Sequence, residues 1–95
     1  MEFDWSRLPS EWGSSLTPRE IEESFEDPFA VRLLPDSARF SAQARYLNLG
    51  MSAAGAGLLS VYRTNGKLFR VIHARAFSAD EQIFYQRRLN VSLSQ

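Results

Sequence analysis

The sequence has no cysteine among its 95 residues. This absence excludes disulfides, thiolate nucleophiles and metal sites built on cysteine, and it fits a reducing compartment. The only histidine is His73, so a metal site would depend on carboxylates, and these cluster in a segment that we expect to be a solvent-facing helix. We therefore expect no metal ion and no other cofactor.

Long hydrophobic runs are missing as well, and the first residues do not read as a basic stretch followed by an apolar one. A membrane-spanning helix needs about 20 predominantly apolar residues in a row, and a secretory leader needs a charged and then an apolar stretch. We therefore expect no membrane span and a cytoplasmic location. Phosphate loops, dinucleotide fingerprints, nucleophile elbows and zinc-ligand spacings are also absent, which excludes the enzyme classes that these motifs identify.

The length of the chain indicates one small domain, and its charged residues are unevenly distributed along it. A chain of this size supports a single core, so we expect one domain over residues 1–95, with a weakly specified segment at 1–16 and a frayed tail at 90–95. Residues 1–36 hold nine acidic residues and three arginines, whereas residues 37–95 hold eight basic and two acidic residues. We favour mutual neutralisation of the two halves; the alternative is a basic surface for phosphates or for an acidic partner.

The strongest local signal is Asn65-Gly66, which separates two runs rich in β-branched, aromatic and aliphatic residues at 57–64 and 67–77. This dipeptide tolerates the positive φ angles of a two-residue turn, so the pattern predicts a β-hairpin with Thr64 opposite Lys67. The same register places Leu58 opposite His73.

Side chains alternate between the two faces of such a hairpin. This parity places Tyr62, His73 and Arg75 on one face, with Arg63 and Arg70 on the other, so Arg70 and Arg75 can share a site only at a sheet edge or across a bulge. We consider His73 with Arg75 a candidate site for proton transfer and phosphate binding, although a lone strand histidine is more often a packed residue. Tyr62 could stack on a base, but a core role is the favoured interpretation.

Two capping boxes predict one helix before and one helix after the main run of strands in the sequence. Thr17-Pro18 with Glu20 predicts a short helix that ends at Asp27-Pro28, and Ser78 with Glu81 predicts a helix from 79 to about 89. Further strands are expected at 29–34 and 44–51, with a short edge strand near Phe3. Trp5 and Trp12 are expected in the core. The predicted fold is α+β: a four-stranded antiparallel meander with a helix in the N-terminal half and a C-terminal helix, packed in two layers.

The order of several motifs resembles the BrnT family, small ribonuclease toxins of bacterial type II toxin–antitoxin pairs with a RelE-like fold. The resemblance covers roughly residues 3–88. It rests on P-x-E-x-E-x-x-F at 18–25, Asp27-Pro28, Arg45-Tyr46, Leu49-Gly50, the hairpin, RVIHAR at 70–75, and Glu81 with Tyr85.

The resemblance implies a metal-independent endoribonuclease in which the 2′-hydroxyl of the RNA is the attacking group. The resemblance places Arg70 and Arg75, and also Arg45, on an RNA-handling surface. Together with the interpretation of the hairpin residues above, the expected catalytic residues are Arg70, His73 and Arg75, and the expected substrate-binding residues are Arg45, Tyr62 and Arg63. The implied partners are RNA and a cognate, BrnA-like antitoxin protein.

Two positions depart from the family pattern. Relatives carry Lys-His-Gly where this chain reads Glu11-Trp12-Gly13, and an arginine where Leu58 follows Gly57. These departures sustain a second hypothesis, a non-catalytic protein-binding module that has kept the fold and holds an antitoxin-like partner or a second copy of itself as a homodimer.

Overall fold

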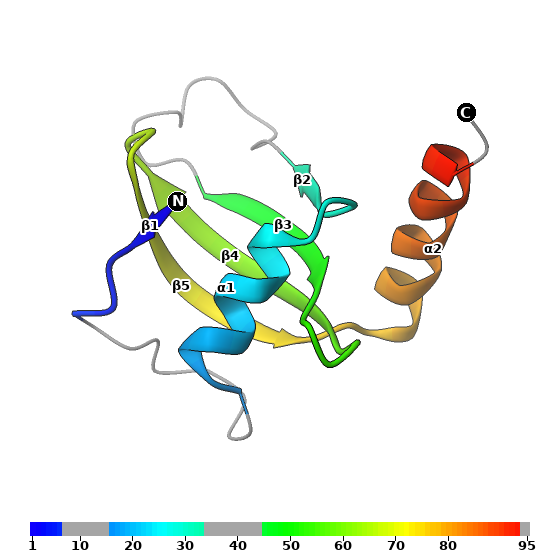
Figure 1. Ribbon diagram of the computed structural model, residues 1–95, viewed down its shortest axis with the longest axis horizontal. Helices are drawn as coiled ribbons and strands as arrows, with labels where there is room; N and C mark the ends of the chain where they lie inside the picture. The colour runs from blue at the N-terminus through cyan, green and yellow to red at the C-terminus, as the bar shows by residue number, and fades with distance from the viewer. Residues whose placement is uncertain (7–15, 34–44, 94–95) are drawn as a thin grey trace.

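The computed structural model describes residues 1–6, 16–33 and 45–93. Figure 1 shows helix α1 lying across one face of a twisted sheet and helix α2 standing beside the sheet, reaching past its edge. The elements are β1 (Glu2–Phe3), α1 (Pro18–Glu26), β2 (Val31–Leu33), β3 (Tyr46–Met51), β4 (Gly57–Thr64), β5 (Leu68–Ala76) and α2 (Ala79–Leu93).

The sheet has five strands in the order β1-β5-β4-β3-β2. Strands β2 to β5 form the expected antiparallel meander, which confirms the α+β class. The expectation of four antiparallel strands is wrong, because β1 adds a fifth strand that runs parallel to β5. A backbone hydrogen bond from Asp4 N to Phe69 O (2.8 Å) extends this pairing. The edge strand near Phe3 is therefore part of the main sheet.

Helix α1 begins as its capping box predicts. The Thr17 hydroxyl accepts a hydrogen bond from Glu20 N at 3.2 Å, and Pro18 occupies the first turn, where its missing N–H costs nothing. Ile21 and Phe25, four positions apart on one helix face, are 0% and 2% exposed. They pack on the sheet in a cluster completed by Leu58, Tyr62, Val71 and Ala74.

Helix α2 extends to Leu93, so the expectation of a frayed tail from residue 90 is wrong for residues 90–93. Side-chain bonds one turn apart support this last part: Gln86 to Asn90 (3.2 Å) and Ser92 to the carbonyl of Arg88 (3.1 Å). Within the described ranges, no helix has the length and apolar character needed to cross a membrane.

The two helices contact opposite faces of the sheet, which departs from a simple two-layer arrangement. Along β3, Asn48 bonds to the carbonyl of Ser24 in α1 (3.2 Å), whereas Leu49 packs in a second cluster with Tyr85 of α2. Alternate residues of one strand point to opposite faces. Because α2 covers only one end of its face, no helix of the described residues lies over the rest of that face (Figure 1).

The hairpin is present, but its predicted register is wrong. The side-chain oxygen of Asn65 accepts hydrogen bonds from the backbone N–H groups of Lys67 and Leu68, both at 2.9 Å, and this widens the turn. As a result Thr64 lies opposite Phe69 instead of Lys67. A two-residue turn was expected from Asn-Gly, but the Asn65 side chain selects a longer loop.

A β-bulge between Val61 and Tyr62 shifts the register once more. Tyr62 pairs with Val71, whereas Val61 pairs with His73, so Ile72 is the extra residue on β5. An extra residue reverses the side-chain parity beyond it. His73 and Arg75 therefore lie on the same sheet face as Arg70, and the predicted separation of Arg70 and Arg75 onto opposite faces is wrong.

The structure describes one of the two tryptophans that were expected in the core. Trp5 stacks on Phe3 with ring centroids 5.7 Å apart, donates a hydrogen bond to Glu22 (2.8 Å) and packs against the core cluster under α1, as a core role requires. Trp12 and the Glu11-Trp12-Gly13 segment lie outside the described residues.

Candidate functional site

The sheet face opposite α1, here called the open face, carries the candidate basic residues. Its side chains on β4 and β5 follow from the register and the bulge. They are Leu59, Val61, Arg63, Arg70, Ile72, His73 and Arg75. Helix α2 packs near Leu59, at the end farthest from the hairpin turn.

Arg63 and Arg70 lie directly opposite each other on β4 and β5. Residues paired in this way have Cα atoms about 4.5–5.5 Å apart, and like charges in that position repel. Arg70 is paired with Asp4 (2.8 Å), whereas Arg63 has no ion pair with any residue in the described ranges. The Asp4 carboxylate neutralises one of the two guanidinium groups. The other leaves excess positive charge, which favours an anionic ligand.

His73 follows Arg70 on the open face, beyond the bulged residue Ile72. Its ring is partly buried, and its Nδ1 atom is buried with no hydrogen-bond partner in the part of the chain that the structure describes. A neutral imidazole can both donate and accept a proton, which suits it to general acid–base chemistry near neutral pH. We call Arg63, Arg70 and His73 the basic patch.

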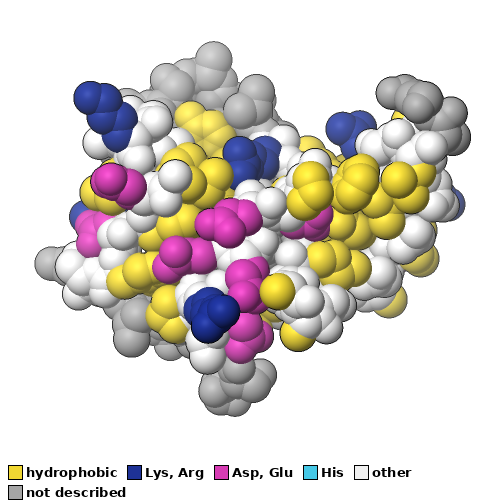
Figure 2. All heavy atoms as spheres, viewed as in Figure 1, with side chains coloured by type: hydrophobic (Ala, Val, Ile, Leu, Met, Phe, Trp, Pro, Cys, Tyr) yellow, Lys and Arg dark blue, Asp and Glu magenta, His cyan; other side chains and the backbone are white. Residues whose placement is uncertain are grey.

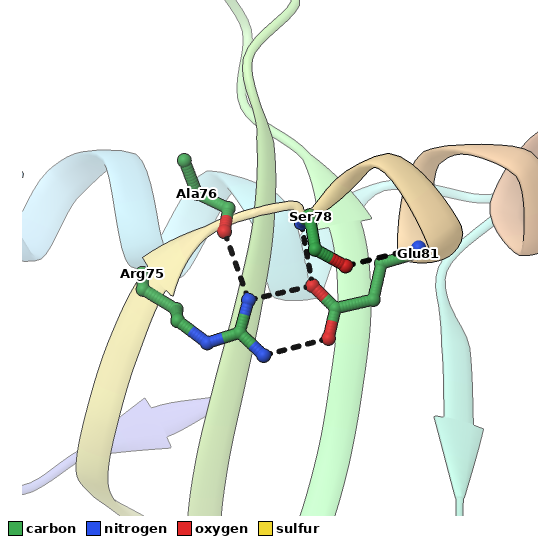
Figure 3. Close-up of polar contacts among 4 residues, drawn as sticks. All are labelled: Arg75, Ala76, Ser78 and Glu81. Atoms are coloured by element: carbon green, nitrogen blue, oxygen red, sulfur yellow. Dashed lines mark hydrogen bonds and ion pairs between the residues drawn. The ribbon is translucent and has the colours of Figure 1, made fainter.

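Arg75 lies on the same face but is held in a two-pronged ion pair (Figure 3). Its two terminal nitrogens donate to the two carboxylate oxygens of Glu81 at 2.6 and 2.7 Å, and one also donates to the carbonyl of Ala76 (3.1 Å). The hydrogen bond from Arg75 is the main cause that lowers the pKa of Glu81, and the same bond raises the pKa of Arg75. This arginine therefore joins β5 to the start of α2.

Glu81 takes part both in the ion pair with Arg75 and in the helix cap at Ser78. Ser78 N donates to Glu81 Oε1 (2.7 Å), and Glu81 N donates to the Ser78 hydroxyl (3.3 Å), as the predicted capping box requires. One carboxylate thus serves both the helix N-terminus and Arg75, as Figure 3 shows.

Tyr62 and Arg45 are not part of the basic patch. Tyr62 points to the α1 side, is 4% exposed and packs edge-on against Phe25 with ring centroids 5.0 Å apart. Burial is the main cause that raises the pKa of its hydroxyl. Arg45 is exposed just before β3. Among the candidate residues, the structure brings together Arg63, Arg70 and His73, with Arg75 next along β5.

Charge is separated between the two faces. Figure 2, which views the α1 side, shows acidic side chains gathered over α1. These include the four glutamates of the helix, whereas the arginines of β4 and β5 lie on the open face. Among the described residues, one ion pair joins the acidic half of the sequence to the basic half, Asp4 with Arg70.

An apolar hollow of about 270 Å³ lies where the open face meets α2. Its lining comes from three strands and the helix: Leu33, Leu47, Leu49, Leu59, Asp80, Glu81 and Phe84. Sequence reasoning missed this hollow because no single segment supplies it. The alternation of Leu47 and Leu49 was the only available signal, and it indicated a buried strand face.

The described residues contain no group of three or more histidine, aspartate or glutamate side chains placed to hold a metal ion. Comparison with protein-family models, curated proteins and solved structures finds no match. The function has to be inferred from the open face itself.

Proposed function

We propose that this chain is a BrnT-like ribonuclease, the toxin component of a bacterial toxin–antitoxin pair, and that it cleaves RNA on the open face without a metal ion. The observation that carries the proposal is the bulge at Ile72, because it places His73 on the same sheet face as Arg63 and Arg70. A proton-transfer group and two phosphate-binding groups then meet at one surface. The motif order described above supports the family assignment.

The proposed reaction needs no nucleophile from the protein. The 2′-hydroxyl of the RNA attacks the adjacent phosphorus, and His73 accepts its proton as the new O–P bond forms. The bond from phosphorus to the 5′-oxygen breaks, and that oxygen takes a proton from solvent, which leaves a 2′,3′-cyclic phosphate and a 5′-hydroxyl. Arg63 and Arg70 stabilise the charge that develops on the phosphate oxygens.

Arg75 has a positioning role in this proposal. Both of its terminal nitrogens are engaged by Glu81, so it supports β5 and α2 instead of contacting RNA. Arg75→Ala is therefore not a diagnostic variant, because its loss of activity would not separate a chemical effect from a structural one.

The test is cleavage of a mixed single-stranded RNA by the purified protein in excess EDTA. We expect cyclic-phosphate products from the wild type and a loss of about 10²–10⁴-fold in rate for His73→Ala. Arg19→Gln, which removes an arginine from the α1 side, is the matched control and should cleave as the wild type does. Absence of EDTA-resistant cleavage by a folded protein, or full activity of His73→Ala, would reject the nuclease proposal.

A second candidate function, a non-catalytic protein-binding module, is favoured by the apolar hollow. Phe84 lines that hollow and is 39% exposed, and Ile83 beside it on α2 is 52% exposed. Exposed apolar surface of this kind suits a partner protein, such as the antitoxin, or a second copy of the chain. Sedimentation of the wild type and of Phe84→Ser tests self-association. The same two proteins, each co-expressed with the antitoxin, test binding of that partner. A Phe84→Ser protein that still binds both would exclude this surface.

A further inference from the structure

A second hollow, of about 210 Å³, lies at the turn end of the hairpin. Its lining residues are Arg63, Thr64, Asn65, Leu68 and Arg70. It is distinct from the apolar hollow beside α2, which shares no lining residue with it. It contains the two opposed arginines and no acidic side chain among its lining residues.

The polar groups of this hollow are mainly donors. The side-chain oxygen of Asn65 accepts hydrogen bonds from the N–H groups of Lys67 and Leu68. The NH₂ group of the same side chain is therefore the part that can bind a ligand, as a donor. The Thr64 oxygen accepts from Gly66 N at 3.0 Å, which leaves its O–H as a donor. Together with two guanidinium groups, these donors fit a ligand that only accepts hydrogen bonds and carries negative charge.

Asp4 supplies such an acceptor at one side of the hollow. Its Oδ2 accepts from Arg70 at 2.8 Å, and its Oδ1 accepts from Ser6 N at 2.9 Å. These contacts hold the pKa of the Asp4 carboxyl well below its usual range, chiefly through Ser6 and then Arg70. The carboxylate therefore stays ionised on Arg70 at neutral pH, while Arg63 is left without an anion in the described ranges.

We propose that Arg63 and Arg70 form a binding site for a phosphate group of a polyanion, and that Asp4 takes the place of the phosphate on Arg70 in the free protein. The inference rests on the proposed function and deepens it, because it assigns the RNA phosphate to the turn end of the hairpin. A phosphodiester carries one negative charge, as the carboxylate does, but its two non-bridging oxygens can each accept from a different guanidinium group, and the other phosphates of the chain add negative potential. The Asp4 carboxylate uses Oδ1 for Ser6 N and binds Arg70 through Oδ2 alone.

The exchange requires only a small rearrangement. Phe3 keeps β1 in place through ring contacts with Phe25 (5.1 Å between centroids) and Phe69 (5.7 Å). The Arg70 side chain is 57% exposed, so its guanidinium can turn from Asp4 to a ligand without opening the core. Asp4 thus competes with the phosphate and lowers its affinity without blocking access.

The experiment measures binding of inorganic pyrophosphate at low salt by titration calorimetry. We expect Arg63→Gln and Arg70→Gln each to weaken binding by about tenfold, which corresponds to loss of one charge-assisted contact. Asp4→Asn should tighten binding several-fold, because it removes the competing carboxylate. Arg19→Gln and Glu26→Gln on α1 each change the net charge by one unit away from this site and should alter the affinity by less than about twofold.

Each alternative result overturns the proposal. Undetectable pyrophosphate binding in both the wild type and Asp4→Asn would show that the hollow does not bind phosphate. Equal effects of Asp4→Asn and Glu26→Gln would show that only net charge matters. The nuclease proposal is judged separately by EDTA-resistant cleavage: binding without cleavage rejects the nuclease and keeps this site, whereas cleavage without binding does the reverse.

Discussion

Tyr85 donates a hydrogen bond to Asp27 at 2.5 Å and thereby joins α2 to the end of α1, 58 positions earlier in the chain. The accepting oxygen, Oδ2, also receives the N–H of Met51 in β3 (2.8 Å), and Oδ1 receives the N–H of Phe29 (2.9 Å). Burial, followed by the Asp27 contact, raises the pKa of Tyr85 well above its usual value, so the phenol remains a donor at neutral pH.

Replacing Tyr85 by phenylalanine should lower the free energy of unfolding by about 1–3 kcal/mol, because the Asp27 carboxylate loses a donor in a partly buried setting. Urea denaturation measures the change. Tyr46→Phe is the matched control, since the Tyr46 hydroxyl makes no hydrogen bond to any of the described residues and its ring stacks on Tyr62. Equal destabilisation by the two variants would contradict a special role for the Tyr85–Asp27 bond.

Gly50→Ala should destabilise the protein by about 3 kcal/mol or more, at the upper end of overpacking costs. A Cβ at Gly50 would lie 1.9 Å from the backbone oxygen of Ser24, so α1 would have to move away from β3. Gly57→Ala provides the comparison, because its Cβ would meet the Phe77 ring at 2.2 Å, and a side chain can turn aside where backbone cannot. Thermal unfolding should rank Gly50→Ala as the more damaging; the reverse order would refute this packing argument.

The Arg75–Glu81 pair predicts a pH-dependent stability difference. Because the pKa of Glu81 is lowered in the folded protein, the ionised carboxylate stabilises the fold fully above its unfolded pKa of about 4.3. That contribution disappears as the pH falls through the lower, folded value. Unfolding free energies of the wild type and Glu81→Gln should therefore differ most near pH 7 and begin to converge as the pH falls below the unfolded pKa of about 4.3. A gap that stays constant from pH 7 to pH 3 would show that the ion pair contributes nothing.

RNA binding to the basic patch should show a measurable salt dependence. For a single-stranded RNA whose 2′-hydroxyls are methylated, and which therefore cannot be cleaved, Arg63→Gln should reduce the slope of log affinity against log salt by about 0.7. The change reflects one fewer phosphate contact. Arg19→Gln should leave the slope as in the wild type. If both variants gave the wild-type slope, RNA would have to bind away from Arg63.

Local signals predicted the helices and most strand positions correctly. The Thr17 and Ser78 capping boxes identify where helices begin, since a cap depends on residues within one turn. The end of α2 was predicted too early because no strong stop signal follows Leu89, and side-chain bonds as far as Ser92 continue the helix. The short edge strand near Phe3 was predicted, but its parallel pairing was beyond local reasoning, because its partner in β5 lies more than 60 residues away.

The candidate site was predicted less well than the fold. The residue types were identified from the sequence, and four of them, Arg63, Arg70, His73 and Arg75, share one face in the structure. Their grouping on that face depends on the bulge at Ile72, which strict alternation of side chains does not predict. Arg75 met an unforeseen partner: Glu81 was expected only as a helix cap, but it also binds the arginine across the β5–α2 junction.

The sequence by itself determined the class of fold, the meander of β2 to β5 and the absence of cysteine chemistry, because these follow from composition, periodicity and contacts within a few residues. Only the tertiary structure decided which basic residues lie together and which are already paired. Arg70 faces Asp4 from the other end of the chain, and His73 reaches the face of Arg63 through one extra residue in β5. Both arrangements depend on strand register and long-range pairing, which are set by packing of the whole sheet and not by any short segment.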